Sequence, residues 1–258
     1  MMNRSARFAF ASLLSFLMVP AWAEDVPGTL QWARRVELTT PVSGQVTEVP
    51  VQANDRVRKG QVLLRLDPRG FQAQVERAQA SLDRAIPAYE EARREMERAQ
   101  ELYDRTVLSN HELEMARIAL AQADAEQRAA RAALSQARLD LEYSVIRAPF
   151  DGIVVQRNAE IGQTVVARLQ PPVLLVLAEA GRMVVRMDVN RVQLSKLALG
   201  QTVPVTVEGK QYEGVVTNIA LEPNPEAIGE PVYPVDVEFA PDQMVQYRPG
   251  QQATVTLP

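Results

Sequence analysis

Residue types that commonly carry chemistry are scarce in this sequence. Its 258 residues contain a single histidine, His111, and no cysteine, so a thiol nucleophile and a thiolate metal site are excluded. A serine–histidine–acid arrangement would have to use His111. The helical pattern around that residue places it at the end of a rod, where no pocket can exclude water from a reaction. We therefore interpret His111 as a surface residue.

Two other groups of residues have a chemical interpretation and a simpler one. Met183 and Met187 lie four residues apart in a predicted strand and could bind a soft metal, but packing in a core is the better interpretation. Glu90, Glu91 and the charged run at 93–98 fit the outer face of a helix, where Glu and Arg form solvated ion pairs. We expect no catalytic residue, no metal and no cofactor, and hence a protein that is not an enzyme.

Net charge and the N-terminus define the class of protein. The formal net charge is −4, which is too small an imbalance to indicate nucleic-acid binding. Two arginines precede an apolar run at 8–19 and an Ala-Trp-Ala cleavage signal, so we predict a cleaved signal peptide over residues 1–23. The apolar run is too short to span a bilayer, although an uncleaved anchor is the alternative. We expect an exported protein in the periplasm, held at the inner membrane through a partner.

Two β-rich segments of the sequence resemble each other at a constant offset of 108 residues. The matching residues are Pro41 and Pro149, Gly44 and Gly152, Val46 and Val154, Asn54 and Gly162, and Val57 and Val165. Asn and Gly are the residues that most readily accept a positive φ, so the same turn fits at both places. The repeat predicts two similar β-motifs that pack face to face.

A helical hairpin is predicted between the two segments, over residues 69–142. Apolar and small residues recur there at alternating spacings of four and three, the heptad pattern of a coiled coil. This seam consists of Phe71, Val75, Ala78, Leu82, Ala85, Tyr89, Ala92, Met96, Ala99 and Tyr103, then Leu113, Ala116, Leu120, Ala123, Gln127, Ala130, Leu134, Ala137 and Leu141. Each arm has roughly 33–35 residues and a length of about 50 Å. A loop at 106–109 reverses the chain.

A further β-rich region follows at 179–258. The segment "GRMVVRMDV" reads as a strand, and "NRVQLSKLALG" as a short helix that ends at Gly200. Four more strands follow, two of them opened by the dipeptides Gly200-Gln201 and Gly250-Gln251. We predict a β-barrel. The first strand after the signal peptide, within 24–38, is expected to join either this barrel or the repeated β-domain.

Two β half-motifs split by a helical hairpin resemble the periplasmic adaptor proteins, also called membrane fusion proteins, of tripartite efflux pumps and related HlyD-like secretion systems. The resemblance covers residues 36–258 and implies an α+β fold. Its parts are a lead-in strand at 24–38, a split lipoyl/biotinyl-like domain at 39–68 and 143–178, a coiled-coil hairpin at 69–142 and a β-barrel at 179–258. In that fold the turn residues of the lipoyl-like halves are Gly44, Asn54, Gly152 and Gly162.

The hairpin tip carries the most specific part of the resemblance. Adaptors that dock onto a TolC-type outer-membrane channel have the pattern R-x3-L-x6-S, which Arg98, Leu102 and Ser109 match. The family pattern continues with an acidic residue and an alanine, here Glu114 and Ala116; the acidic residue is glutamate where aspartate is usual. The resemblance implies that these five residues contact the channel.

The same tip residues also have simple structural interpretations. Arg98 carries a fork of donors that suits a carboxylate or backbone carbonyls on a partner helix, but it could equally be solvated. Leu102 could be an apolar contact or internal packing. Ser109 with Glu112 three residues later fits a capping box at the start of the second helix. The combined spacing at the tip favours docking.

The resemblance also implies the partners. An adaptor links an inner-membrane transporter, here expected to be of the resistance-nodulation-division (RND) type, to the outer-membrane channel, and it self-associates into an oligomeric sheath around the path of small molecules. Many adaptors of RND pumps continue into a fourth, membrane-proximal domain. Since the sequence ends at Pro258 after the last predicted strand, we expect that domain to be absent or vestigial.

Three alternatives remain open. An adaptor of an ABC-type or protein-secretion exporter is the first, although adaptors of the haemolysin-secretion type carry an N-terminal membrane helix that we do not predict here. A lipoyl-like carrier subunit of an enzyme would need an acceptor lysine between the halves; residues 67–142 contain none, and Lys59 lies inside the first half. A purely structural coiled-coil protein is the third, and the split repeat argues against it.

Overall fold

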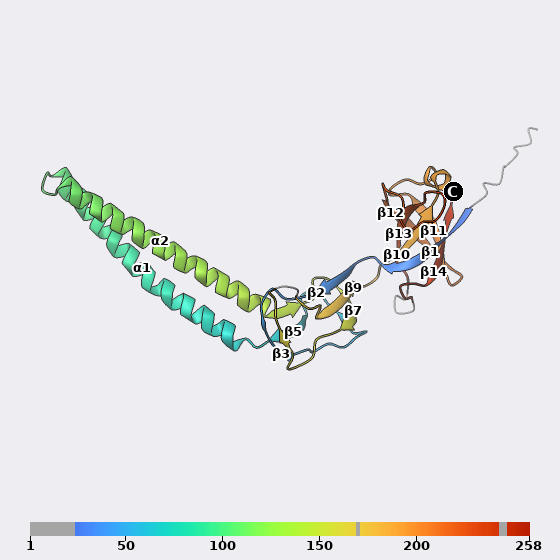
Figure 1. The fold of residues 1–258 in the computed structure, drawn as a ribbon, viewed down its shortest axis with the longest axis horizontal. Helices are drawn as coiled ribbons and strands as arrows, with labels where there is room; N and C mark the ends of the chain where they lie inside the picture. The colour runs from blue at the N-terminus through green and yellow to red at the C-terminus, as the bar shows by residue number, and fades with distance from the viewer. Residues whose placement is uncertain (1–23, 169–170, 243–246) are drawn as a thin grey trace, which may run out of the picture. The chain divides into compact units, whose positions relative to one another are not determined.

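The computed structural model describes residues 24–168, 171–242 and 247–258 (Figure 1). The predicted signal peptide, residues 1–23, lies outside these ranges. The chain divides into two compact units. One contains residues 32–181, and the other combines the strand before residue 32 with residues 182–258.

The first unit contains two four-stranded sheets, ordered β2-β9-β7-β4 and β6-β5-β3-β8. The strands are β2 (Arg35–Leu38), β3 (Gly44–Glu48), β4 (Arg56–Val57), β5 (Val62–Leu66), β6 (Val145–Arg147), β7 (Gly152–Arg157), β8 (Thr164–Val165) and β9 (Leu175–Glu179). Strands of the two repeated halves pair with each other: β3 with β8 in one sheet and β4 with β7 in the other. The halves therefore share one core, in which Leu63, Leu64 and Val154 are completely buried.

The repeat is reproduced in the hydrogen bonds of its turns. Asn54 and Gly162 have φ values of +76° and +89°. The backbone N–H of Asn54 donates to the carbonyl of Val154, and that of Gly162 donates to the carbonyl of Val46, both at 2.8 Å. Because Val46 and Val154 are themselves equivalent in the repeat, each turn is fastened to the opposite half by the same bond.

The other two residues predicted to be in turns are placed differently. Gly44 and Gly152 are the first residues of β3 and β7, and neither has a positive φ. Gly152 is required by a close approach of two chains, since a Cβ there would lie 2.3 Å from the carbonyl oxygen of Ala178. At Gly44 the nearest atom to such a Cβ is in Leu66, at 3.3 Å. The offset of 108 aligned them correctly, but their structural role is strand packing.

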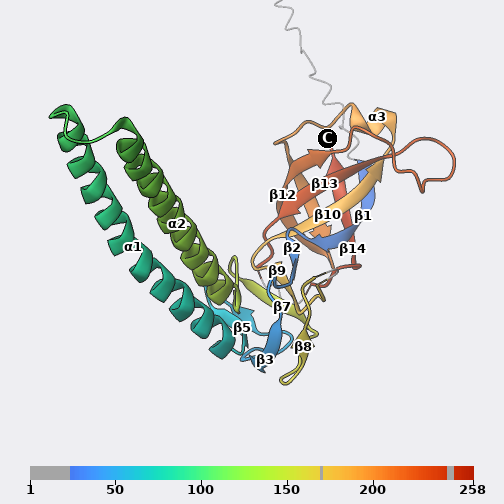
Figure 2. The same ribbon diagram turned by 60° about the vertical axis from the view of Figure 1, so that its left-hand side comes forward.

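Two long helices, α1 (Arg69–Asp104) and α2 (Asn110–Tyr143), connect the two halves in the sequence; they lie side by side and project away from the sheets of this unit (Figures 1 and 2). α1 passes through Pro87 without a break. The buried helical residues all belong to the predicted seam; they are Ala78, Leu82, Ala85, Ala99, Leu113, Leu134 and Ala137. Ala78 and Leu82 pack against Leu134 and Ala137 in one cluster. Among the described residues, no helix is both long and apolar enough to cross a membrane.

The second unit is a closed β-barrel with the strand order β1-β10-β13-β12-β11-β14. Its strands are β1 (Glu24–Trp32), β10 (Met183–Val189), β11 (Thr202–Val207), β12 (Lys210–Ile219), β13 (Tyr233–Phe239) and β14 (Gln252–Leu257), and the short helix α3 (Arg191–Leu194) follows β10. Both Met183 and Met187 are buried. The predicted lead-in strand at 24–38 is divided, since β1 closes the barrel and β2 joins the first unit.

Four turns, two in each unit, share one construction around a Gly-Gln pair. Each glycine has a φ between +80° and +89°, as the third position of a type II turn requires. The following Gln side chain accepts a hydrogen bond from the backbone N–H three residues earlier, at 2.6–3.0 Å. The four glutamines are Gln61, Gln163, Gln201 and Gln251. Each Gln side chain thus accepts the hydrogen bond that the first backbone N–H of the turn would otherwise donate to water.

Candidate functional site

Three of the predicted docking residues lie around the loop that joins the helices. Arg98 and Leu102 are one turn apart near the end of α1, and Ser109 directly precedes α2. The Arg98 guanidinium pairs with Glu95 through an Nη1–Oε2 distance of 2.6 Å, and its side chain is 63% exposed. Leu102 is partly buried. Such an exposed ion pair adds little stability, so Arg98 can exchange Glu95 for another acceptor at small cost.

Ser109 begins α2 with the predicted capping box. Its hydroxyl accepts from the backbone N–H of Glu112 at 3.3 Å, and its own N–H donates to Glu112 Oε2 at 2.9 Å. The hydrogen bonds from the Ser109 side chain and backbone lower the pKa of Glu112 below its usual value. Ser109 therefore has a structural role at the tip, whether or not it also contacts a partner.

Glu114 and Ala116 lie in the first two turns of α2, at about the same distance from the loop as Arg98 in α1. Glu114 forms a 3.5 Å ion pair with Arg117, and both side chains are more than half exposed. Ala116 is partly buried on the seam side of the helix. The five predicted docking residues thus lie in the last two turns of α1, at the N-cap of α2 and in the first two turns of α2.

The loop contains two residues that sequence reasoning missed. Thr106 has a φ of +60°, which is uncommon for a β-branched residue. Its N–H donates to the carbonyl of Tyr103 at 2.8 Å, and the next N–H, that of Val107, donates to the carbonyl of Leu102 at 3.0 Å. The Val107 side chain is 71% exposed. The sequence signal that could have identified Val107 is an apolar residue within a short polar loop.

The hairpin tip contains few residues of the types that take part in catalysis. His111 is exposed in the first turn of α2. Within the described ranges, no group of three or more His, Asp or Glu side chains is arranged to hold a metal ion.

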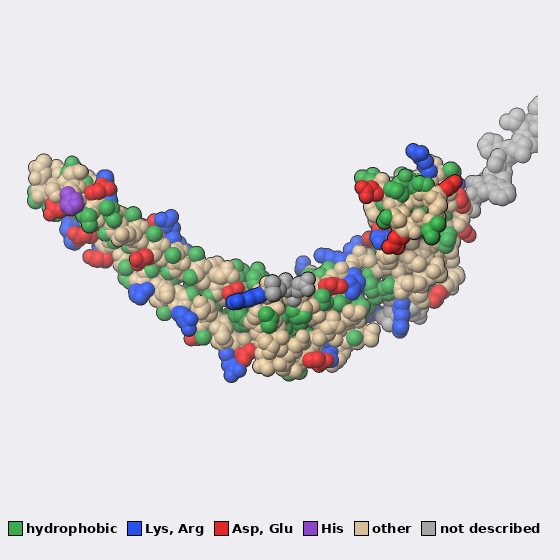
Figure 3. Space-filling view, viewed as in Figure 1, with side chains coloured by type: hydrophobic (Ala, Val, Ile, Leu, Met, Phe, Trp, Pro, Cys, Tyr) green, Lys and Arg blue, Asp and Glu red, His purple; other side chains and the backbone are tan. Residues whose placement is uncertain are grey.

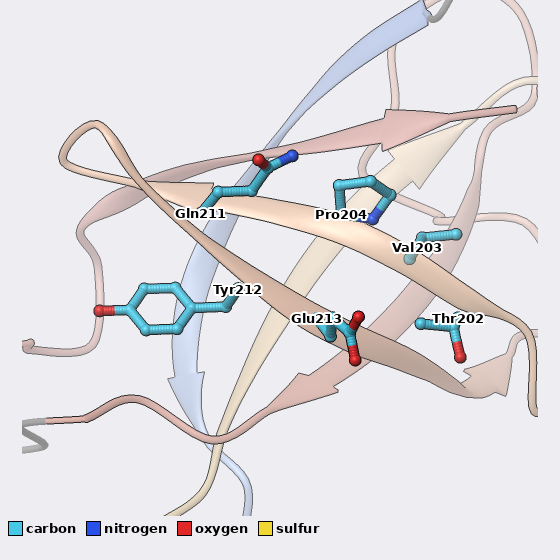
Figure 4. Close-up of a pocket in the computed structure, with 6 residues that line it drawn as sticks. All are labelled: Thr202, Val203, Pro204, Gln211, Tyr212 and Glu213. Atoms are coloured by element: carbon cyan, nitrogen blue, oxygen red, sulfur yellow. The ribbon is translucent and has the colours of Figure 1, made fainter.

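A groove of about 440 Å³ lies on the wall of the barrel (Figure 4). It is lined by Thr202, Val203, Pro204, Gln211, Tyr212 and Glu213. The hydroxyl groups of Tyr212 and Tyr247 are 2.8 Å apart, and this hydrogen bond, together with burial, raises the pKa of Tyr212 to about 12. Tyr212 therefore stays protonated at neutral pH and cannot serve there as a base. Among these six residues Glu213 is the one carboxylate, so the lining contains no pair of carboxylates.

Comparison with known proteins places the fold in a family. The model for the barrel-sandwich hybrid domain of RND membrane fusion proteins matches residues 34–177. This range coincides with the first structural unit from β2 to β9, hairpin included.

Individual relatives agree with this match. Macrolide export protein MacA of Yersinia pestis is 31% identical over 249 residues, covering 89% of this chain and 67% of the relative. Multidrug resistance protein MdtA of Pectobacterium atrosepticum is 31% identical over 152 residues, covering 59% of this chain and 37% of the relative. The chain thus spans only part of the length of these relatives.

A solved structure shows the same fold over nearly the whole chain. The membrane fusion protein Spr0693 of Streptococcus pneumoniae R6 superimposes with a TM-score of 0.70 at 18% identity, covering 91% of this chain and 98% of that one. The family model matches more than half of the sequence. The chain therefore belongs to the membrane fusion proteins, the periplasmic adaptor family, and carries their RND-type barrel-sandwich hybrid domain.

Proposed function

We propose that this protein is the periplasmic adaptor of a tripartite efflux pump, linking an inner-membrane transporter to a TolC-type outer-membrane channel. The observation that carries the proposal is the position of Arg98, Leu102 and Ser109. Within an adaptor fold, residues that match the channel-docking pattern lie at the end of its helical hairpin.

Docking at the tip would be an exchange of contacts. Arg98 leaves its solvated ion pair with Glu95 for an acceptor on the channel, where a guanidinium can form two parallel hydrogen bonds. Leu102 and Val107 supply apolar contact beside it. The capping box at Ser109 keeps the start of α2 rigid, so less conformational entropy is lost on binding.

The remaining parts of the proposal concern the partners and the cargo. The β-barrel would contact the transporter, and RND-type transporters are the first candidates because the matching family model carries that description. Relatives named for macrolide export and multidrug resistance favour small molecules as the exported class. The adaptor would act in the periplasm without catalysis or a cofactor, and several copies would surround the path.

A crosslinking experiment in intact cells tests the docking. Since the chain has no cysteine, an Asn110→Cys variant can carry a photo-crosslinker at the tip as its one labelled thiol. We expect an adduct with an outer-membrane channel, identified by mass spectrometry. Adding Arg98→Asp should abolish the adduct. Arg94→Asp is the matched control, because Arg94 has the same i,i+3 pairing with Glu91 one turn further from the tip, and it should preserve the adduct.

Two results would contradict the proposal. Adducts with no outer-membrane channel would remove docking altogether. Equal loss of the adduct in both arginine variants would show that general charge, and not the tip motif, governs the contact.

A further inference from the structure

α1 ends in a turn that closes back onto the helix through two backbone hydrogen bonds. The N–H of Thr106 donates to the carbonyl of Tyr103 at 2.8 Å, and the N–H of Val107 donates to the carbonyl of Leu102 at 3.0 Å. Since the last helical residue is Asp104, these are the two bonds that define a Schellman motif, with Thr106 in its left-handed position. The backbone therefore fixes the shape of the loop before any partner is bound.

The residue at that left-handed position is unusual. Glycine is the common residue there, because a Cβ is crowded at a positive φ. Within the described ranges the other non-glycine residues with a positive φ are Asn54 and Glu208, and neither is β-branched. The Thr106 hydroxyl donates to the adjacent carbonyl of Arg105 at 2.6 Å, and the side chain is exposed. Glycine would form the same turn with less strain, so the threonine side chain adds to the surface of the tip and not to its stability.

The turn also leaves an apolar side chain in solvent. In a Schellman motif the residue at the position of Val107 commonly packs on the residue at the position of Leu102. Here Leu102 is partly buried, whereas Val107 is 71% exposed. Leu102 thus forms the base of a small projection, and Val107 with the methyl group of Thr106 forms its exposed part. We call these three residues the tip knob.

The loop around the tip knob carries no charge. Residues 106–110 include no Asp, Glu, Lys or Arg. In Figure 3 the outermost surface of the hairpin is mostly uncharged, and the charged side chains lie further along the helices. Arg98 lies one turn before Leu102 on α1, in its exposed ion pair. The tip knob is therefore an apolar projection with a guanidinium beside it.

We propose that Thr106 and Val107 are specificity-determining residues for the outer-membrane channel, and that the tip knob enters an apolar pocket on that channel. The inference rests on the docking function proposed above. It adds two residues that the docking pattern leaves open, since both lie in the six unspecified positions between Leu102 and Ser109. The pocket that fits takes one isopropyl and one methyl group, and an acceptor for Arg98 lies about 6 Å from it along α1.

The size of the tip knob favours a protein pocket over a lipid surface. Binding to a bilayer scales with the apolar area that is buried, and two exposed side chains supply little of it. A pocket desolvates the same side chains on all sides. Because the turn is already closed, binding also costs little conformational entropy. Removal of both methyl groups of Val107 should then weaken docking roughly tenfold.

Thr106→Gly separates recognition from stability, because it should change the two in opposite directions. In the purified full chain, relief of the strain should raise the protection of the Val107 amide against hydrogen exchange about fivefold. In intact cells at low expression, the yield of channel adduct from a photo-crosslinker at Asn110→Cys should fall about threefold, because a methyl contact is lost. Asn54→Gly is the matched control, since Asn54 has a φ of +76° in the β-domain. It should leave the adduct yield unchanged.

Val107→Ala tests the apolar contact directly. Because Val107 is exposed, the substitution should leave the exchange protection of α1 unchanged, while the adduct yield falls roughly tenfold. Ile161→Ala is the control for loss of an exposed apolar side chain, since Ile161 is 68% exposed in a turn of the β-domain. It should preserve the adduct.

Three outcomes would overturn the inference. If both tip variants give the normal adduct yield while Arg98→Asp still abolishes it, the docking function stands and the tip knob has no part in it. If Thr106→Gly changes protection and adduct yield in the same direction, the threonine acts through the stability of the loop. Adducts between two copies of this chain that Val107→Ala abolishes would assign the tip knob to a second hairpin. Absence of a channel adduct in the parent Asn110→Cys chain would instead contradict the docking function itself, and this inference with it.

Discussion

The lipoyl-like β-domain and the helical hairpin belong to one structural unit but are stabilised in different ways. In the β-domain, strands from both halves of the repeat enclose a core in which side chains such as Leu64 are completely buried. In the 36 residues of α1 only four are buried, and in the 34 of α2 only three. The β-domain is complete by itself, whereas each helix is packed along one narrow seam. The stability of this unit therefore comes mainly from the sheets, and most of the helical surface is available for contacts.

A cavity in the core of the β-domain should destabilise the protein more than any other change considered below. Leu64→Ala should lower the free energy of unfolding by about 3–5 kcal/mol, because the side chain is completely enclosed. Leu134→Ala, in the hairpin seam, should cost about 2 kcal/mol, because two helices surround a side chain less fully and can close over the gap. Chemical denaturation followed by circular dichroism measures both. Equal losses would show that the hairpin seam is as tightly packed as the sheets.

Two glycines of the repeat separate close packing from turn geometry. Gly152→Ala should cost about 2–3 kcal/mol, because the new Cβ meets the carbonyl of Ala178 and the strands must move apart. Gly162→Ala should cost about 1–2 kcal/mol, because the alanine meets no atom within 4 Å but has to adopt a φ of +89°. Thermal unfolding of the two variants compares them. A larger loss for Gly162→Ala would mean that the β7–β9 contact relaxes easily.

The Gly-Gln turns allow the two units to be compared through one type of bond. Gln163→Leu removes the acceptor of the Glu160 backbone N–H, and Gln251→Leu removes the acceptor of the Arg248 backbone N–H. Each substitution should lower the free energy of unfolding by about 1 kcal/mol. The first substitution should act on the lipoyl-like unit and the second on the barrel. Amide hydrogen exchange resolves the two units, and a loss of protection that spreads equally through both would show that they unfold together.

Much of the architecture could be predicted from the sequence, because periodicity reports burial. The offset of 108 residues paired the two half-motifs, and the seam contained every helical residue that is buried. The role of Gly152 could not be predicted, since it depends on how closely Ala178 approaches from another strand. The split of residues 24–38 between two units depends likewise on distant strand partners.

The tip shows the same limit. Ser109 and Glu112 were recognisable as a capping box because its four residues are contiguous. The left-handed conformation of Thr106 has no local signature and is imposed by the closure of the loop onto Leu102 and Tyr103.

The smallest effect is expected at the capping box, and it depends on pH. Hydrogen bonds from Ser109 hold the pKa of Glu112 in the folded tip below its usual 4.5. This contribution to stability is therefore fully present above pH 4.5 and is lost as the pH falls through the lower, folded pKa. The protection of the amides at the start of α2, measured as the exchange rate relative to the intrinsic rate at the same pH, should decrease on acidification in the natural protein. Glu112→Gln, whose uncharged side chain can still complete a capping box, should remove that pH dependence, and Ser109→Ala should cost about 1 kcal/mol at neutral pH.

Exchange in the sheets should not follow this titration; if it did, the tip would be coupled to the β-domain, and the division between a self-sufficient core and an independent hairpin would have to be abandoned.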